Sequence, residues 1–196
     1  MNKSLTTFIF LFYFSLFHVI SENKLSFKKI DNKQGLSQNG VMAIFQDKNG
    51  FIWLGTHYGL NRYDGFSIKS FYRGNTQNDL CGDDIQSILQ DSVGNIWIST
   101  IEGISVFNPV TEKFFNLNKY TTKESIFRHT ILSMKYIDGE ILISSKEELW
   151  KINAVTSLFT DEIANNICSN IVKFKIQPIL NLKSIKVFFK DKNDNY

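Results

Sequence analysis

At 196 residues the chain has room for about one domain. Its 18 Phe, 7 Tyr and 3 Trp can form a sizeable core, and its formal net charge of +3 comes from Lys and Arg scattered among Asp and Glu. No basic stripe is present, so the sequence gives no support for nucleic-acid binding.

The N-terminal end is predicted to be a secretory signal. Phe8–Ile20 contains no charged residue and is too short for a membrane span, which needs about twenty apolar residues. The small residues Val19 and Ser21 precede a cleavage point after Ser21. We therefore expect residues 1–21 to be a helical signal peptide and residues 22–196 to be exported to the periplasm. An uncleaved segment would act as a tether and leave the rest of the chain in the same compartment.

Two segments of the chain repeat the same turns and apolar positions. DKNGFIWLGTHYGLNRYDG (47–65) is followed by DSVGNIWISTIEGISVFNP (91–109), with Trp97 44 residues after Trp53. A fainter third copy covers DGEILISSKEELWKINAVTSLF (138–159). The positions that we expect to serve the repeated structure are Asp47, Gly50, Trp53, Thr56, Gly59, Asp91, Gly94, Trp97, Thr100 and Gly103.

Each copy predicts four short strands separated by turns. The first gives strands at 41–46, 51–56, 60–64 and 67–72, and the second at 85–90, 95–100, 104–108 and 113–117. A four-stranded meander repeated in tandem indicates a β-propeller, whose blades typically number 4–8. A β-sandwich would not require the same turns at a fixed period. The tryptophans are expected to pack between neighbouring blades.

The expected fold is therefore all-β, a partial β-propeller of about three blades and a stub. The blades are predicted at 36–79, 80–124 and 125–165, with an incomplete fourth at 166–196. SIKVFFKDKNDNY (184–196) resembles the first strand and turn of the first copy, GVMAIFQDKNGFI (40–52). We interpret this as a truncated propeller, which would be a fragment, a shortened reading frame or a piece completed by another chain. Its open blade edges would also allow self-association.

The string GLSQNGVMAIFQDKNGFIWLGTHYGLNRYDGF (35–66) resembles the two-component regulator propeller repeat. The hallmark is an L-S-x-N-x-V start, then D-x-x-G-x-[IL]-W-[IL]-G-T, then G-L-x-x-[YF]-[DN]; the second copy has Ser99 in place of the second glycine. In that family such repeats form periplasmic sensor propellers of hybrid histidine kinases, which bind glycan fragments. The resemblance implies a ligand-sensing propeller for an oligosaccharide, without signalling output of its own, since kinase and receiver motifs are absent. The alternative is a non-catalytic interaction scaffold or an inactive truncated remnant.

The sequence offers no evidence for catalysis, a cofactor or a metal site. GxSxG, P-loop, His-x-x-His and Cys-x-x-Cys strings are absent, and the repeated Asp residues are typical of turns. In a meander, the second hairpin of each blade and the loop between blades share one end of the sheets. Polar and aromatic groups at that end are candidates for glycan binding, although an ordinary solvated loop would have similar residues. The candidates are His57, Tyr58, Arg62, Asn39, Asp83, Glu102, Arg128 and Lys146, of which the first three are favoured.

Overall fold

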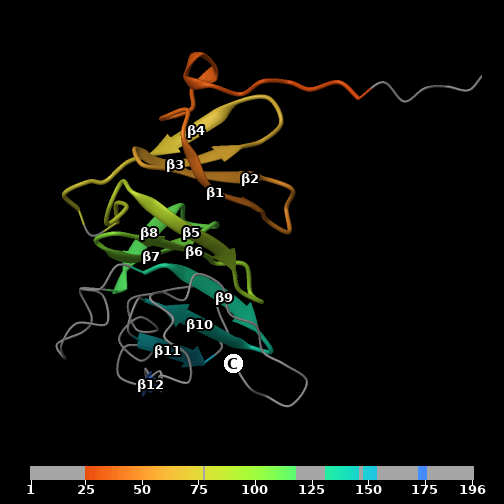
Figure 1. The fold of residues 1–196 in the computed structure, drawn as a ribbon. Coiled ribbons are helices and arrows are strands. Elements are labelled where there is room, and N and C mark those ends of the chain that lie inside the picture. The colour runs from red at the N-terminus through yellow and green to blue at the C-terminus, as the bar shows by residue number, and fades with distance from the viewer. Residues whose placement is uncertain (1–24, 77, 118–130, 146–147, 154–171, 176–196) are drawn as a thin grey trace, which may run out of the picture.

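The computed structural model describes residues 25–76, 78–117, 131–145, 148–153 and 172–175 (Figure 1). The predicted signal peptide, Arg128, Lys146 and the strand-like segment 184–196 lie outside the described residues. The described chain forms three four-stranded antiparallel sheets, preceded by a short 3-10 turn, η1 (Asn32–Gln34). The prediction of an all-β fold is confirmed.

The first two sheets contain the strands that the repeat predicts. The first consists of β1 (Val41–Gln46), β2 (Ile52–Thr56), β3 (Gly59–Tyr63) and β4 (Ile68–Phe71). The second consists of β5 (Ile85–Gln90), β6 (Ile96–Thr100), β7 (Gly103–Asn108) and β8 (Lys113–Asn116). Both sheets have the same register, because Ile44 pairs with Leu54 as Ile88 pairs with Ile98.

The third sheet consists of β9 (Ser133–Ile137), β10 (Glu140–Ser144), β11 (Glu148–Asn153) and β12 (Val172–Lys175). Its outer strand pairs Lys151 with Val172 and lies beyond the range 125–165 expected for this blade. The expectation rested on the likeness of NAVTSLF (153–159) to the turn and strand NPVTEKF (108–114). A similarity over seven residues does not determine which strand pairs with β11, because pairing depends on contacts with residues far away in the sequence. The C-terminal boundary of the third sheet therefore differs from the prediction.

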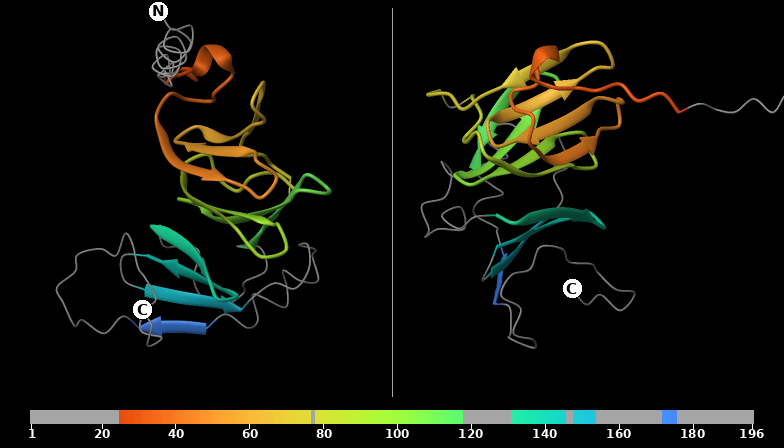
Figure 2. Two further views of the ribbon diagram at one scale, coloured as in Figure 1. Left: turned by 90° about the vertical axis from the view of Figure 1, so that its right-hand side faces the viewer. Right: turned by 45° about the horizontal axis from the view of Figure 1, so that its top comes forward.

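The three sheets are stacked face to face, with β5 between β1 and β9 (Figures 1 and 2). Trp53 is 1% exposed in the core between the first and second sheets, where its ring meets Phe107 at 5.3 Å between centroids. Trp97 is 0% exposed in the core between the second and third sheets. The prediction that the tryptophans pack between sheets is confirmed.

A glycine in β2 lets the first two sheets approach closely. A Cβ added at Gly55 would lie 2.5 Å from Cγ2 of Ile85 in the next sheet. Atoms cannot approach that closely without one of them moving, so only glycine fits this contact. In the second sheet the equivalent position is Ser99, which is completely buried.

Candidate functional site

Three loops meet at one end of the first two sheets. The β2–β3 hairpin carries His57 and Tyr58, the β6–β7 hairpin carries Ile101 and Glu102, and the segment 73–84 leads into β5. The carbonyl of Asp83 accepts from Gly59 N at 2.8 Å, and that of Asp84 accepts from Ile101 N at 3.2 Å. The segment before β5 is therefore fixed between the two hairpins. We call this group of loops the loop edge.

His57 contacts the second sheet through a carboxylate. Its Nδ1 lies 2.9 Å from Asp84 Oδ1, which also accepts a hydrogen bond from Gln86 Nε2 at 2.7 Å. Both partners retain access to solvent, with 47% of the His57 side chain and 26% of the Asp84 side chain exposed. His57 and Asp84 can therefore form hydrogen bonds with a ligand without any rearrangement of the buried core.

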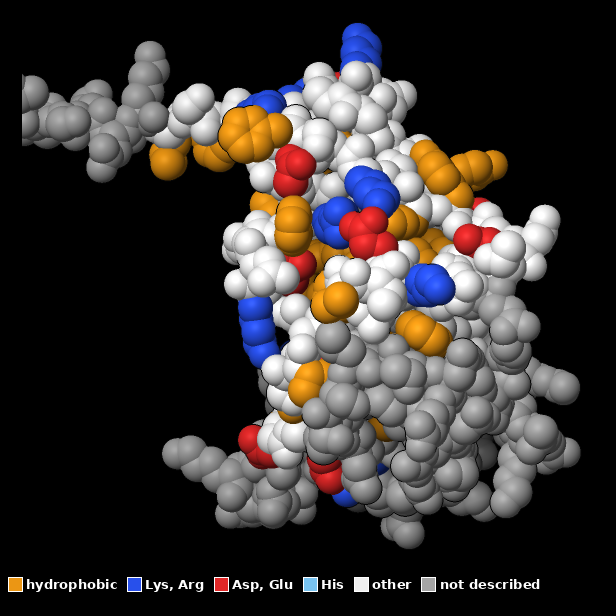
Figure 3. All heavy atoms as spheres, turned by 180° about the vertical axis from the view of Figure 1, so that it is seen from behind, with side chains coloured by type: hydrophobic (Ala, Val, Ile, Leu, Met, Phe, Trp, Pro, Cys, Tyr) orange, Lys and Arg blue, Asp and Glu red, His pale blue; other side chains and the backbone are white. Residues whose placement is uncertain are grey.

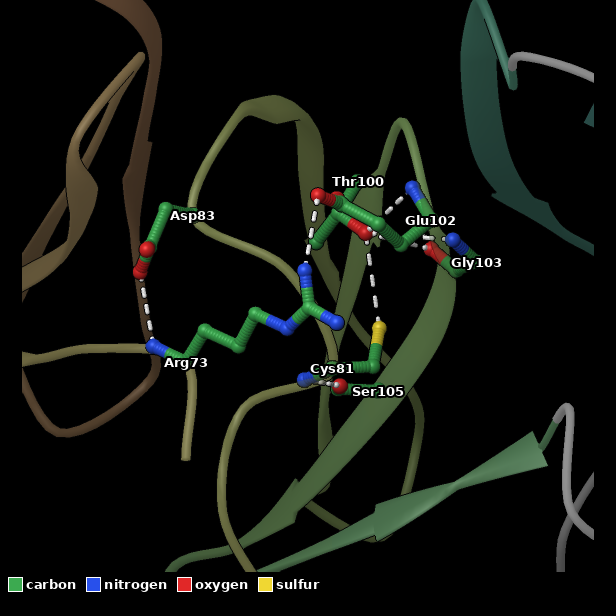
Figure 4. Close-up of polar contacts among 7 residues, drawn as sticks. All are labelled: Arg73, Cys81, Asp83, Thr100, Glu102, Gly103 and Ser105. Carbon is green, nitrogen blue, oxygen red and sulfur yellow. Dashed lines mark hydrogen bonds and ion pairs between the residues drawn. The ribbon is translucent and has the colours of Figure 1, made fainter. Parts of the chain in front are cut away.

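Arg73 lies between two acidic residues of the loop edge (Figure 4). Its backbone N donates to Asp83 Oδ1 at 2.6 Å, and its Nη1 lies 3.7 Å from Glu102 Oε1. The ion pair is largely exposed, so it contributes little to stability, in the range of about 0–1 kcal/mol. The guanidinium is therefore held in place loosely and can change partners when a polar ligand arrives.

A buried hydrogen-bond group supports the loop edge from below (Figure 4). Cys81 N donates to Ser105 Oγ at 3.0 Å, and its Sγ lies 3.4 Å from Thr100 Oγ1. Burial raises the pKa of the Cys81 thiol, so the thiol stays protonated and unreactive. The first sheet repeats this arrangement with Ser37 and Thr56, whose hydroxyl oxygens lie 2.9 Å apart.

Tyr58 is the exposed aromatic group of the loop edge, with 66% of the residue accessible. Its backbone N donates to Thr56 Oγ1 at 3.0 Å, which fixes the hairpin. Gly59 completes the turn at a φ of 121°, and a Cβ there would lie 2.8 Å from the carbonyl oxygen of Phe71. The hairpin thus presents the Tyr58 ring from a rigid base.

The structure brings together four of the eight predicted binding residues: His57, Tyr58, Asp83 and Glu102. Asn39 lies ahead of β1, and its Oδ1 accepts from Asn32 N at 2.9 Å. Arg128 and Lys146 are outside the described residues. Arg73 and Asp84 were missed by the sequence prediction, although the Asp83–Asp84 pair in the loop between two blades was a usable signal.

Arg62 lies apart from the loop edge, toward the opposite end of β3. Its guanidinium lies 4.8 Å from the centroid of the Phe51 ring, and its Nη2 lies 3.0 Å from Glu112 Oε1 in the β7–β8 turn. Lys69 Nζ contacts the other oxygen of Glu112 at 2.6 Å. Figure 3 shows basic and acidic side chains side by side on the outer surface of the upper sheets. Arg62 therefore joins two sheets and does not accompany His57 and Tyr58.

In the described part of the chain, no group of three or more His, Cys, Asp or Glu side chains is arranged to hold a metal ion. Within the same residues, no helix has the length and apolar character needed to cross a bilayer.

Stacked four-stranded antiparallel sheets with a repeated tryptophan define a propeller-type protein. The family described as Two component regulator propeller matches residues 35–58 and 79–102, which cover the start of each of the first two sheets. These two segments are similar to the repeat of that family, which is the resemblance that the sequence predicted.

Two solved structures from one organism are similar to this chain in fold. The extracellular domain described as that of the hybrid two component system BT3049 from B. thetaiotaomicron aligns with a TM-score of 0.58 and 24% identity, over 68% of this chain and 19% of that one. The extracellular domain described as that of the hybrid two component system BT4673 from the same organism gives a TM-score of 0.52 and 21% identity, over 66% of this chain and 19% of that one. These likenesses show the propeller fold.

A curated relative is similar to a shorter stretch of the chain. Histidine kinase P4 of Formosa agariphila is 39% identical over 71 residues, which are 36% of this chain and 5% of the kinase. The chain thus spans a small part of the kinase and about a fifth of each solved domain.

Proposed function

We propose that this chain is a ligand-sensing propeller of a two-component regulator, and that the loop edge binds an oligosaccharide. The observation that carries the proposal is the meeting of Tyr58, His57, Asp83, Arg73 and Glu102 at one end of two adjacent sheets. The loop edge offers an exposed aromatic ring beside donors and acceptors of hydrogen bonds. Sugars need both, because their faces are apolar and their hydroxyl groups donate and accept.

The proposed role is recognition, without catalysis and without output from these 196 residues. The similar proteins are named as a histidine kinase and as extracellular domains of hybrid two component systems, so we also propose that this chain acts outside the cytoplasm. The uncharged segment Phe8–Ile20 supports export.

Binding can be tested with the purified full chain and a panel of soluble oligosaccharides of defined composition, measured by isothermal titration calorimetry. Tyr58→Ala is expected to weaken binding of any active member about tenfold or more, because the aromatic platform is lost. The matched control is Phe66→Ala, which removes a ring that is 94% exposed in the β3–β4 turn at the opposite end of the sheet. Equal affinity of the Tyr58→Ala variant and the unmodified chain would contradict the proposed site.

A second variant separates recognition by the loop edge from general surface effects. Arg73→Gln keeps the backbone hydrogen bond to Asp83 and removes the charge that faces Glu102. Since Arg73 is exposed, the fold is expected to be unchanged while binding of an active oligosaccharide weakens. The same enthalpy and affinity for both proteins would exclude Arg73 from the site.

A further inference from the structure

The loop edge carries two exposed tyrosine rings around one glycine. Tyr58 is 66% exposed and Tyr72 is 53% exposed. Gly59 follows Tyr58 in the hairpin, and a Cβ added to it would lie 3.1 Å from Cδ1 of Tyr72, so the second ring lies against the turn that presents the first. An exposed aromatic face attracts the apolar face of a sugar ring, and it also attracts a cation.

The hairpin that carries Tyr58 is joined on both sides of that residue to two consecutive acidic residues. His57, which precedes Tyr58, contacts Asp84 Oδ1 through its Nδ1 at 2.9 Å. Gly59, which follows Tyr58, donates from its backbone N to the carbonyl of Asp83 at 2.8 Å. Tyr58 is therefore held beside the Asp83–Asp84 pair by a contact on each side.

Asp84 has one carboxylate oxygen available for a ligand. Its Oδ1 has two partners, His57 Nδ1 at 2.9 Å and Gln86 Nε2 at 2.7 Å. Within the described residues, no donor lies within hydrogen-bond distance of its Oδ2, and 26% of the Asp84 side chain is exposed. A neutral imidazole donates its hydrogen to the carboxylate and leaves the negative charge in place. Asp84 is therefore a charged acceptor that a ligand can reach.

The guanidinium of the loop edge is already matched to a different carboxylate (Figure 4). Arg73 Nη1 lies 3.7 Å from Glu102 Oε1, so these two charges compensate each other. The other acidic side chains of the loop edge are those of Asp79, Asp83 and Asp84. With His57 neutral, negative charge therefore exceeds positive charge in these loops. Because like charges repel, this excess disfavours uronic-acid and sulfated sugars and favours a ligand that carries a positive charge.

We propose that the loop edge recognises an oligosaccharide with free amino groups, and that one ammonium group binds the Asp84 carboxylate and the face of the Tyr58 ring. This inference rests on the proposed function and narrows its ligand to one class of sugar. The ring and the carboxylate favour a cation for independent reasons, the ring through its quadrupole and the carboxylate through its charge. The Arg73 guanidinium, compensated by Glu102, donates hydrogen bonds to hydroxyl groups of the same oligosaccharide.

The first test compares two oligosaccharides of the same shape, the β-1,4-linked tetramers of glucosamine and of glucose, which differ by an amino group in place of one hydroxyl group in each ring. Binding to the purified full chain is measured by isothermal titration calorimetry at pH 7 and low salt. The glucosamine tetramer is expected to bind about five- to tenfold more tightly, and added salt should reduce the difference. Equal affinity for the two, or tighter binding of a galacturonic acid tetramer, would overturn the inference.

The second test changes the carboxylate. Asp84→Asn removes the charge and keeps the shape of the side chain, so it should weaken binding of the glucosamine tetramer about five- to tenfold and change that of the glucose tetramer less than about twofold. Glu112→Gln is the matched control, since it removes the same charge from the β7–β8 turn, away from the loop edge. An equal loss with both variants would mean that only the net charge of the protein acts, and would overturn the role of Asp84.

Further outcomes distinguish failure of this inference from failure of the proposed function. If another oligosaccharide binds and Tyr58→Ala weakens it, while the glucosamine tetramer does not bind, sugar recognition by the loop edge stands and the preference for amines is overturned. If no oligosaccharide binds, both are overturned. Tetralysine carries several ammonium groups without a sugar ring, so it should bind more weakly than the glucosamine tetramer. Equally tight binding of tetralysine would make the loop edge a general cation surface and overturn the assignment to an amino sugar.

Discussion

The indole Nε1 of Trp53 donates a hydrogen bond of 2.7 Å to Asp47 Oδ2, and Trp97 donates in the same way to Asp91 Oδ2 at 3.0 Å. The other oxygen of each carboxylate accepts backbone N–H groups of the adjoining turn, among them Asn49 N and Asn95 N, both at 2.9 Å. One carboxylate thus fixes both the first hairpin and the orientation of the tryptophan between two sheets. This explains why the first two copies of the repeat have an Asp six residues before Trp53 and Trp97.

Replacing Asp91 by Asn is expected to lower the free energy of unfolding by about 2 kcal/mol. Asp91 is 1% exposed, and an amide at this position cannot accept from the turn and from Trp97 Nε1 at the same time. Urea denaturation followed by tryptophan fluorescence measures the change. Asp84→Asn is the control, since Asp84 is partly exposed and its loss should stay within about 0.5 kcal/mol. Equal stability of the two variants would show that the hydrogen bond from the Trp97 indole makes no net contribution to the free energy of unfolding.

Gly59→Ala is expected to destabilise the protein by more than Gly65→Ala. Both glycines have a positive φ, 121° and 98°, which costs a non-glycine residue about 1–3 kcal/mol. Only at Gly59 does a Cβ meet a backbone atom, Phe71 O, at 2.8 Å; at Gly65 nothing lies within 4 Å. The difference between the two variants, measured by chemical denaturation, isolates the steric contact from the conformational cost. Identical losses would mean that the β4 backbone moves aside.

Glu112 is expected to add an acid-sensitive contribution to stability. Hydrogen bonds from Lys69 and Arg62 hold the pKa of Glu112 below its ordinary value of 4.5. Because the pKa is lower in the folded state, this contribution is present above the ordinary value and is lost as the pH falls through the folded value. Glu112 is largely exposed, so its share should remain below about 1 kcal/mol and weaken with added salt.

The measurement is the free energy of unfolding between pH 3 and 7 for the unmodified chain and for Glu112→Gln. The difference between them should shrink toward zero at the acid end. Asp64 also has a lowered pKa, of about 2, because of hydrogen bonds from Ser67 and Phe66. Its contribution is the same in both proteins, so it cancels in the difference between them. A difference that stays constant across this pH range would contradict an electrostatic role of Glu112.

Ser99→Ala is expected to leave the protein equally stable or to stabilise it by up to about 1 kcal/mol. Ser99 Oγ is completely buried, and within the described residues it has no hydrogen-bond partner. Removing an unsatisfied hydroxyl relieves its desolvation cost. The control is Ser105→Ala, which removes an oxygen that accepts from Cys81 N at 3.0 Å and should destabilise. Thermal unfolding of both variants distinguishes the two outcomes.

The strands of the first two sheets could be predicted because local residues determine them. Asp47 and Gly50 fix the first turn, Gly59 the second, and the alternation of apolar residues fixes which face is buried. The same reasoning explains why Trp53 was correctly expected in the core.

Contacts between sheets could not be predicted in the same way. Arg62 was grouped with His57 by closeness in sequence, but antiparallel strands carry the two toward opposite ends of the sheet. Its partner Glu112 is 50 residues away and reaches it only because the sheets stack. The outer strand Val172–Lys175 was missed for a related reason, since nothing in its own sequence shows which strand it pairs with.

Gly55 has a consequence for the shape of any longer array of these repeats. Ile85 can approach the β2 backbone only because no Cβ is present at Gly55, whereas the second sheet has Ser99 at the same place. A larger side chain at this position requires the following sheet to lie farther away. In a longer array of such repeats, the residue at this one position would therefore limit how closely each sheet can approach the next.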